Sequence, residues 1–376
     1  MSLEKHLKKL ARFQYEHHLM IVVVSLIITV YMAQGLGNVY METDFAKMMP
    51  QDVPVFKNSE KVSSRFGGSD LVLVVVELDH GSDIKDKPQD IRDPRIMRML
   101  GELQTQLAAE PKIDRVLSAG SFFPYGVPQT LTGVKTVLSA IPGSDGMFNK
   151  DYSITMLYIY TNVGGGSRAV TSFTRIIEDN IENVAKPPGV ELTITGGPPI
   201  GKTIAEILWS DAIYTTLLAA AIILVLLAIL QKSIYKGVLI FIPLLLGLTW
   251  TLGAMGHLDI PLSVATVAVG AMILGLGVEY GVFVVERYME EREGKGKSPA
   301  ESIEVAVPGV GSAILGSGIT TMVGFGSLRL GIMPMMQDLG TTLALGIASC
   351  LLVSLLVNPA FIILGGRITG FGGRER

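Results

Sequence analysis

Cysteine and charge are both scarce in this sequence. Its 376 residues include one cysteine, and charged residues make up only 17% of the chain. A single cysteine excludes an internal disulfide and indicates nothing about the redox compartment. Because Cys350 lies in an apolar run, we expect a small buried residue there. The formal net charge of −3 lacks the basic surplus of a nucleic-acid-binding protein, so no nucleic-acid partner is expected.

Apolar residues dominate the composition instead. Hydrophobic residues make up 49% of the chain and the mean hydropathy is +0.45, which is more apolar than an ordinary soluble protein. A membrane-spanning helix needs about 20 mostly apolar residues. Six segments qualify: 19–36, 209–230, 237–256, 262–285, 305–328 and 343–364. We therefore expect an α-helical polytopic membrane protein with six transmembrane helices.

The first of these segments follows a short basic stretch, as a signal peptide would. No small-x-small cleavage site follows it, so we interpret 19–36 as a retained anchor. Residues 1–18 place four apolar side chains on one helical face, with lysines elsewhere: Leu3, Leu7, Leu10 and Phe13. This pattern predicts an amphipathic helix lying on an anionic membrane surface, and a plain solvated helix is the alternative.

The distribution of lysine and arginine predicts the orientation in the membrane. With six spans, the basic clusters before the first, between the second and third, after the fourth and after the sixth all fall on one side. The opposite short loops carry only Arg329. Both termini, including a tail at 367–376, are therefore expected in the cytoplasm of a cell-membrane protein. Residues 37–207 would form an extracytoplasmic domain, and 208–366 would hold the second to sixth spans.

The expected extracytoplasmic domain contains two successive strand–helix–strand patterns. The first combines 70–78, 93–110 and 113–119, and the second combines 152–161, 167–185 and 189–195. Such a pair predicts an α/β sandwich of the ferredoxin-like type. A helix predicted from Ile200 continues into the second span, which would couple this domain mechanically to the membrane helices.

The segment GGPPIGKT, residues 196–203, matches the phosphate-binding pattern G-x-x-x-x-G-K-[ST]. That loop binds phosphate through backbone N–H groups, and Pro198 and Pro199 have none to donate. The segment also falls on the extracytoplasmic side, away from cellular ATP. We therefore interpret it as a tight turn that starts a helix, and we expect no cofactor, no metal and no enzymatic activity.

Glu279 interrupts the fourth apolar segment, within GLGVEYGVFVVERYMEERE at 275–293. It lies six residues before Val285, about 9 Å inside the cytoplasmic end of the span. An acid at such depth costs roughly 2.5–3.5 kcal/mol. The cost falls when the acid is protonated, faces the bundle interior or has a partner, so we expect Glu279 to load and unload a proton. A snorkelling Glu279, or one paired with Arg287, is the alternative.

Small and hydroxyl-bearing residues accompany this acid. Four glycines thin the fourth span so that another backbone can approach: Gly270, Gly275, Gly277 and Gly281. Four hydroxyls of the fifth span bracket the depth of Glu279 and could pass a proton or hold water: Ser312, Ser317, Thr320 and Thr321. Tight packing with hydroxyls bonded to their own backbone is the alternative. The glutamates that follow are expected to form a solvated face with local ion pairs: Glu286, Glu290, Glu291 and Glu293.

This arrangement resembles one repeat of the resistance–nodulation–division transporter superfamily, in particular its MMPL-like branch. The similar motifs are the Glu279–Tyr280 pair with the RYMEE run after it, AILGSGITTMVGFGSLRLG in the fifth span, VNPAFIILG in the sixth and the TGGPPIG turn. The resemblance covers nearly the whole chain and implies that Glu279 is the proton-relay acid and Tyr280 its partner. Ser317 would line the relay, with Thr320 as a further hydroxyl. The family pattern has Asp where this chain has Glu279.

Most members of that superfamily fuse two such repeats about an axis along the membrane normal. The resemblance therefore implies that this single repeat forms a symmetric homodimer. Our hypothesis is that each Glu279 hydrogen-bonds Tyr280 of the other subunit, so that the two acids titrate as a coupled pair.

The function implied is a proton-motive-force-driven exporter of lipids or other hydrophobic or amphiphilic molecules, with membrane lipids, protons and that substrate as partners. Two alternatives stay open. A Sec-type protein-export accessory motor would co-purify with a translocon, although that branch lacks the Glu-Tyr pair. A non-transporting lipid-sensing membrane protein would bind lipid irrespective of the proton gradient.

Overall fold

The computed structural model describes residues 2–66, 70–79, 81, 84–161, 163 and 167–369. The chain divides into two compact units, one formed by Met1–Met41 with Ile207–Arg376 and the other by Glu42–Glu206. Each unit has its own hydrophobic core. The sequence predicts limits of 37 and 207 for the smaller unit. The expected tail at 367–376 lies outside the described residues from 370 onward.

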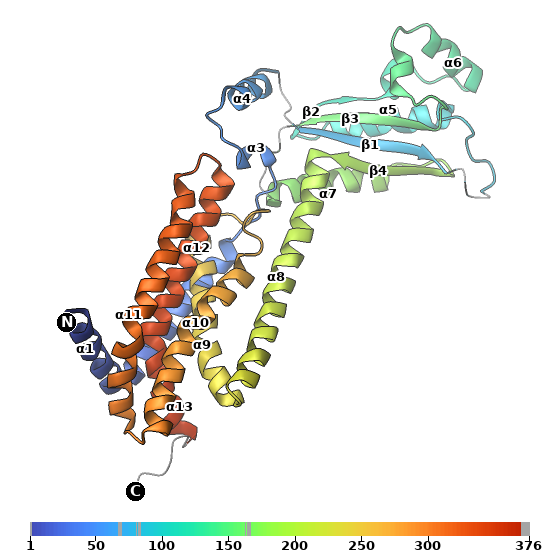
Figure 1. Cartoon of the computed structure of the whole chain (residues 1–376). Coiled ribbons are helices and arrows are strands. Elements are labelled where there is room, and N and C mark those ends of the chain that lie inside the picture. Colours follow the sequence, from blue (N-terminus) through green and yellow to red (C-terminus); the bar gives the residue numbers. More distant parts are fainter. Residues whose placement is uncertain are drawn as a thin grey trace. The chain divides into compact units, whose positions relative to one another are not determined.

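The Glu42–Glu206 unit is built on a four-stranded antiparallel sheet (Figure 1). Its strands are β1 (Asp70–Leu78), β2 (Ile113–Leu117), β3 (Ile154–Thr161) and β4 (Val190–Gly196), in the order β2-β3-β1-β4. Helix α5 (Pro94–Ala108) connects β1 to β2, and α7 (Ser167–Asn183) connects β3 to β4. This is the connectivity of the ferredoxin-like sandwich, and the predicted fold of the domain is confirmed.

Alternation in β1 explains the core of this unit. Val72, Val74 and Val76 are fully buried on one face of the sheet, as a strand with one face in the core requires. The apolar stripe of α5 packs in the same core. Helix α5 begins at Pro94 because Asp93 caps it, accepting a hydrogen bond of 2.8 Å from the Arg95 backbone N–H.

Three helices of this unit escape prediction because they are short or lie in loop-like sequence. Helices α3 (Phe45–Met48) and α4 (Pro54–Phe66) precede β1, and α6 (Leu131–Ser139) lies in the connection from β2 to β3. Lys135 of α6 forms an ion pair of 2.8 Å with Asp90, which also binds Arg92 at 2.7 Å. Burial raises the pKa of Asp90, but hydrogen bonds from Arg92 and Lys135 lower it by more, so it lies well below its usual range.

The segment 196–203 forms the turn that the sequence predicts. Strand β4 ends at Gly196 and helix α8 (Gly197–Leu230) begins at the next residue. Gly196 has φ +110°, and a Cβ there would lie 2.1 Å from the Leu71 carbonyl oxygen. The amine of Lys202 lies 2.9 Å from both carboxylate oxygens of Glu178 on α7, so an ion pair within the domain occupies it.

Among the residues described, six helical segments are long and apolar enough to span a membrane, and all lie in the larger unit except the start of the second, which belongs to the smaller one. They are His18–Asn38, Gly197–Leu230, Ile234–His257, Val269–Gly294, Pro299–Leu330 and Pro334–Arg367. Their main helices are α2 (His18–Gly35), α8, α9 (Ile234–His257), α10 (Val269–Met289), α11 (Pro299–Gly326), α12 (Pro334–Leu352) and α13 (Asn358–Thr369). Helix α8 runs without a break from the end of β4 through the second span, as predicted.

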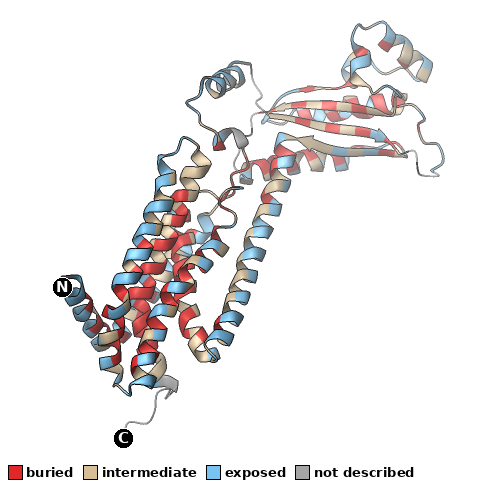
Figure 2. Cartoon of the chain, viewed as in Figure 1, coloured by how far each residue is buried: buried red, intermediate tan, exposed pale blue. Residues whose placement is uncertain are grey.

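The core of this unit lies among α9, α10 and α12. Helices α2 and α8 are mostly exposed, as Figure 2 shows for α8. Val30 of α2 and Leu217 of α8 are each 64% exposed. Exposed apolar side chains along a spanning helix face hydrocarbon, so these helices form lipid-facing walls. The polytopic membrane fold with a small α/β domain is therefore confirmed.

Helix α10 begins at Val269, seven residues after the predicted start of the fourth span at 262. Hydroxyl groups hold the preceding residues in a turn instead. Thr266 Oγ1 accepts a hydrogen bond of 2.8 Å from the Ser263 backbone N–H and donates one of 3.2 Å to the Pro261 carbonyl. Such hydrogen bonds from side chains to the backbone compete with the backbone hydrogen bonds of a helix. Hydropathy does not reveal this competition.

The N-terminal helix α1 (Ser2–Glu16) packs on the bundle as well as being amphipathic. Leu7, Ala11 and Gln14 are buried, and a Cβ on Gly311 of α11 would lie 3.1 Å from Leu7 Cδ1. Leu3 and Phe13 stay 50% and 44% exposed. The predicted apolar face is therefore divided between contact with α11 and an outward side.

Candidate functional site

Glu279 lies on an exposed side of α10, within the fourth span. Its neighbour Tyr280 is only 1% exposed and belongs to the core of the bundle. Adjacent helical residues point about 100° apart, so the two side chains occupy different surroundings. The hypothesis that Tyr280 binds Glu279 of the other subunit requires an accessible Tyr280 hydroxyl, and the structure places that side chain inside its own bundle.

Helix α11 runs antiparallel to α10 and packs beside it. A Cβ on Gly309 would lie 3.6 Å from Arg287 Nε, so the two helices are in contact near their connecting turn. Glu279 of α10 and Ser317 of α11 both lie farther along these helices, away from that turn.

Small residues surround Glu279 on these two helices. Gly275 is exposed one turn from it, and a Cβ there would meet nothing within 4 Å; the same holds for Gly316 of α11. Ser317 and Thr320 are exposed as well. We call this surface the open face: Gly275, Glu279, Gly316, Ser317 and Thr320. Three of the four predicted site residues are thus exposed on two neighbouring helices, and Tyr280 is the buried one.

The hydroxyl groups of α11 are partly engaged by their own helix. Thr320 Oγ1 donates hydrogen bonds of 3.1 and 2.8 Å to the carbonyls of Gly316 and Ser317, and Thr321 Oγ1 donates one of 2.8 Å to the Ser317 carbonyl. A donating hydroxyl keeps its lone pairs, so Thr320 can still accept a hydrogen bond from a protonated acid or a water.

Tyr280 connects the open face to a polar position inside the bundle. Its hydroxyl lies near the Thr321 side chain of α11. On the next residue, a Cβ on Gly281 would lie 3.8 Å from Asn358 Nδ2 of α13. Asn358 is fully buried, and neither polar atom of its side chain has a hydrogen-bond partner in the described part of the chain. Such a group needs a partner such as ordered water.

Asn358 is part of the motif VNPAFIILG, but the sequence assigns it no role of its own. It is an amide in an otherwise apolar run, directly after five residues that form a π-helical turn, Val353–Val357 (η6). Turns of this type frequently mark functional positions within helices. Cys350 is buried in the same core, as expected, and a Cβ on Gly277 would lie 2.6 Å from its Sγ.

The charged end of α10 differs from the predicted solvated face. Glu291 is fully buried in a second π turn, Glu290–Gly294 (η4), where Arg287 and Lys295 each approach it to 2.8 Å and Lys297 also binds it. The prediction is wrong for this residue because three cations enclose its carboxylate. Local ion pairs do occur, and Lys236 reaches Glu293 at 2.8 Å. The described residues contain no cluster of three or more potential metal ligands.

The chain is similar to known membrane proteins over most of its length. A family model described as the MMPL family matches residues 47–375. A membrane protein of Methanocaldococcus jannaschii is 37% identical over 373 residues, which cover 98% of this chain and 96% of that protein. The siderophore exporter MmpL5 of Mycobacterium tuberculosis is 24% identical over 357 residues, 93% of this chain but 34% of the exporter.

The apo-petrobactin exporter of Bacillus anthracis is 28% identical over 211 residues, which cover 53% of this chain and 27% of the exporter. The chain thus aligns with about a third or less of either exporter. The extent of the family match and the similarity to the M. jannaschii protein show that this multi-pass membrane protein belongs to the MMPL family.

Proposed function

We propose that the chain exports lipids or other hydrophobic molecules and is driven by the proton-motive force, with Glu279 as the proton-carrying group. One relative is named as a siderophore exporter and another as an apo-petrobactin exporter, which supports transport as the general activity. The observation that carries the proposal is an ionisable side chain on an exposed face within a spanning helix. Acids in such positions typically mark ion pathways.

An exposed Glu279 is not stable against hydrocarbon. A charged acid at depth in the bilayer costs roughly 2.5–3.5 kcal/mol, which protonation or a polar partner reduces. Within one copy, the open face offers only the hydroxyls of Ser317 and Thr320. The site is therefore incomplete in a single copy, and a second protein surface is needed to enclose it.

A second copy of the chain supplies that surface. Rotation about an axis along the membrane normal places the open face against itself, so that the small residues let the two helix pairs approach closely. Glu279 then faces Glu279 of the partner subunit, with the hydroxyls of α11 beside both. Two acids this close favour a state with at least one proton bound, because both cannot be charged without repulsion.

Proton exchange at this pair would drive the transport cycle. When Glu279 changes charge, the stable arrangement of α10 and α11 changes, because the charged and neutral forms need different surroundings. We propose that the proton passes between Glu279 and the interior position of Tyr280, Thr321 and Asn358. Helix α8 is continuous with the end of β4, so a movement of the second span would be transmitted to an extracytoplasmic α/β domain.

Infrared difference spectroscopy on the reconstituted protein tests this proposal. We expect a protonated-carboxyl band that changes on a pH jump near neutrality, is lost in Glu279→Gln and persists in Glu286→Gln. Glu286 is a matched control because it lies on the same helix and is exposed, where it accepts a hydrogen bond from Gln231. If wild type shows no such band, Glu279 is a solvated acid and a lipid-sensing role without proton coupling replaces the exporter.

A further inference from the structure

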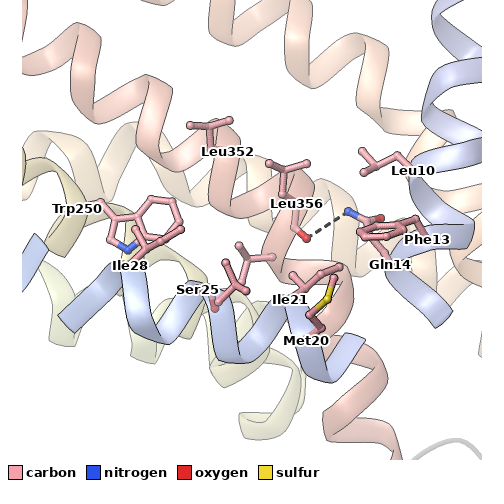
Figure 3. A pocket seen from close by; sticks show the side chains of 12 residues that line it. Leu10, Phe13, Gln14, Met20, Ile21, Ser25, Ile28, Trp250, Leu352 and Leu356 are labelled. Atoms are coloured by element: carbon pink, nitrogen blue, oxygen red, sulfur yellow. Dashed lines mark hydrogen bonds between the residues drawn. The ribbon is translucent and has the colours of Figure 1, made fainter. Parts of the chain in front are cut away.

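An apolar cavity opens between the N-terminal helix and the first span, away from the open face (Figure 3). Its volume is about 390 Å³, which is in the usual range for sites that hold one small molecule. Its walls come from α1, α2, α9 and the middle of the sixth span, where α12 passes into η6. The lining residues are Leu10, Phe13, Gln14, Met20, Ile21, Val24, Ser25, Ile28, Trp250, Leu352, Leu356 and Val357.

The hydrogen-bond donors among the polar side chains of this lining are already bonded to the protein, whereas Gln14 Oε1 is buried without a partner among the described residues. Ser25 Oγ donates a hydrogen bond of 2.8 Å to the Val22 carbonyl, and Trp250 Nε1 donates one of 2.8 Å to Thr29 Oγ1. Gln14 Nε2 donates to the Leu355 carbonyl at 2.6 Å and to the Leu356 carbonyl at 3.2 Å. The cavity therefore presents hydrocarbon to an occupant, without a free donor for a headgroup.

Gln14 joins two walls of the cavity. The carbonyls that it binds belong to the π turn η6, where the regular hydrogen-bond ladder of the sixth span is interrupted. Both partners are carbonyls, so the side-chain amide must point its nitrogen toward them, and the orientation is fixed. This contact ties α1 to the sixth span, and the cavity lies beside the tie.

The mouth of the cavity lies among side chains that face the bilayer. Met20 and Val24 of α2 are 48% and 47% exposed, and Leu352 is 51% exposed. These residues belong to candidate membrane spans, whose exposed faces contact lipid chains. Helix α2 packs on α9 and α13, whereas the open face belongs to α10 and α11, so the proposed dimer contact does not account for this surface.

We propose that this cavity is a binding site for one hydrocarbon chain of a bilayer phospholipid. A hydrocarbon chain bound in this preformed apolar cavity would fill the space between α1, α2 and the π turn and gain van der Waals contacts with its walls. The lining selects for apolar chain and against polar headgroup, because each of its donors is already engaged. The proposal rests on membrane insertion alone and is independent of proton coupling at Glu279.

Quenching of Trp250 by brominated lipid tests the proposal. The chain has two tryptophans, so Trp209→Phe leaves Trp250 as the only one. The full-length protein in detergent micelles, without other phospholipid, is titrated with phosphatidylcholine brominated along one acyl chain. Trp250 is 9% exposed, so bulk lipid reaches it poorly. We expect quenching that saturates at a low fraction of brominated lipid.

Two adjacent valines provide a matched pair of variants in this background. Val24 lines the cavity and Val23 does not, although both are on α2 and are 47% and 54% exposed. We expect Val24→Phe to abolish the saturable quenching and Val23→Phe to retain it. Leu352→Phe narrows the cavity from the opposite wall and is the second filling variant if Val24→Phe fails to fold.

Quenching that rises linearly with brominated lipid and is equal in both valine variants would overturn the proposal. Saturable quenching by a brominated free fatty acid, without any by the phospholipid, would also overturn it, because it assigns the cavity to a soluble hydrophobe instead of a bilayer lipid.

Discussion

Substitutions at two glycines of α10 can distinguish the stability of a single copy from the contact between two copies. Gly275 belongs to the open face, and a Cβ there would meet nothing within 4 Å. Gly277 faces inward, where a Cβ would lie 2.6 Å from Cys350 Sγ and 2.9 Å from Leu244 Cδ1. We therefore predict that Gly275→Leu leaves the fold of one copy intact and weakens the dimer, and that Gly277→Ala destabilises the fold itself.

The expected magnitudes follow from these contacts. Overpacking a close-packed core costs about 1–3 kcal/mol, and Gly277→Ala recovers up to about 1 kcal/mol of this through helix propensity. Gly275→Leu incurs no overpacking in one copy. In the proposed dimer, however, it places a large side chain where two helix pairs meet at small residues, and a loss of about 1.4 kcal/mol there is a tenfold weaker association.

Subunit association in vesicles, measured by energy transfer between labelled copies over a range of dilutions, provides the first readout. Thermal unfolding of the dilute protein provides the second. We expect Gly275→Leu to weaken association at least about tenfold with little change in unfolding, and Gly277→Ala to lower the unfolding temperature. Unchanged association in Gly275→Leu would refute the open face as the dimer contact.

Three further predictions concern other parts of the chain. Glu279→Asp keeps the acid but shortens its reach, so it should retain a proton-dependent infrared band at reduced amplitude, whereas loss equal to that of Glu279→Gln would contradict a simple proton carrier. Asp90 has a pKa below its usual range in the folded domain, so its stabilising contribution is present above about pH 4 and is lost as the pH falls toward the folded value. The protection factors of β3 amides against hydrogen exchange, corrected for the intrinsic rate at each pH, should therefore fall on acidification, and less so in Asp90→Asn. A Cβ on Gly256 of α9 would lie 1.8 Å from the Gly35 carbonyl oxygen, so Gly256→Ala should separate α2 from α9 and lower the unfolding temperature, while Gly275→Ala, on an open surface, should not.

Much of the fold is encoded in patterns that a single sequence displays. The alternation of Val72, Val74 and Val76 predicts β1, and uninterrupted apolar runs predict the six spans, because burial imposes both periods directly. The start of α10 is not predictable in this way, since it depends on hydrogen bonds of the Thr266 hydroxyl. The burial of Glu291 depends on the π turn, which places Lys295 and Lys297 against its carboxylate. The spacing of charged residues in the sequence does not reveal this.

The site is only partly predictable for a related reason. Glu279 is conspicuous as an acid in an apolar run, but which side of α10 faces the core is decided by α9 and α12, which pack against Tyr280 and Gly277. The sequence does not reveal the importance of Asn358. Its side chain is buried without a hydrogen-bond partner among the described residues, and this is a property of the packed structure. The cavity beside Trp250 likewise depends on four separate helices.

The open face and the lipid-facing cavity need different neighbours, and their chemistry indicates which. A surface that contains Glu279 together with glycine and hydroxyl groups cannot be covered well by hydrocarbon, because the acid then lacks a polar partner. A cavity whose donors are all engaged offers no hydrogen-bond donor to a polar protein surface but accepts a lipid chain. In the proposed dimer, one side of the bundle therefore contacts a second copy of the chain and another contacts the bilayer. A single copy in the membrane would leave Glu279 without the polar partner that it needs.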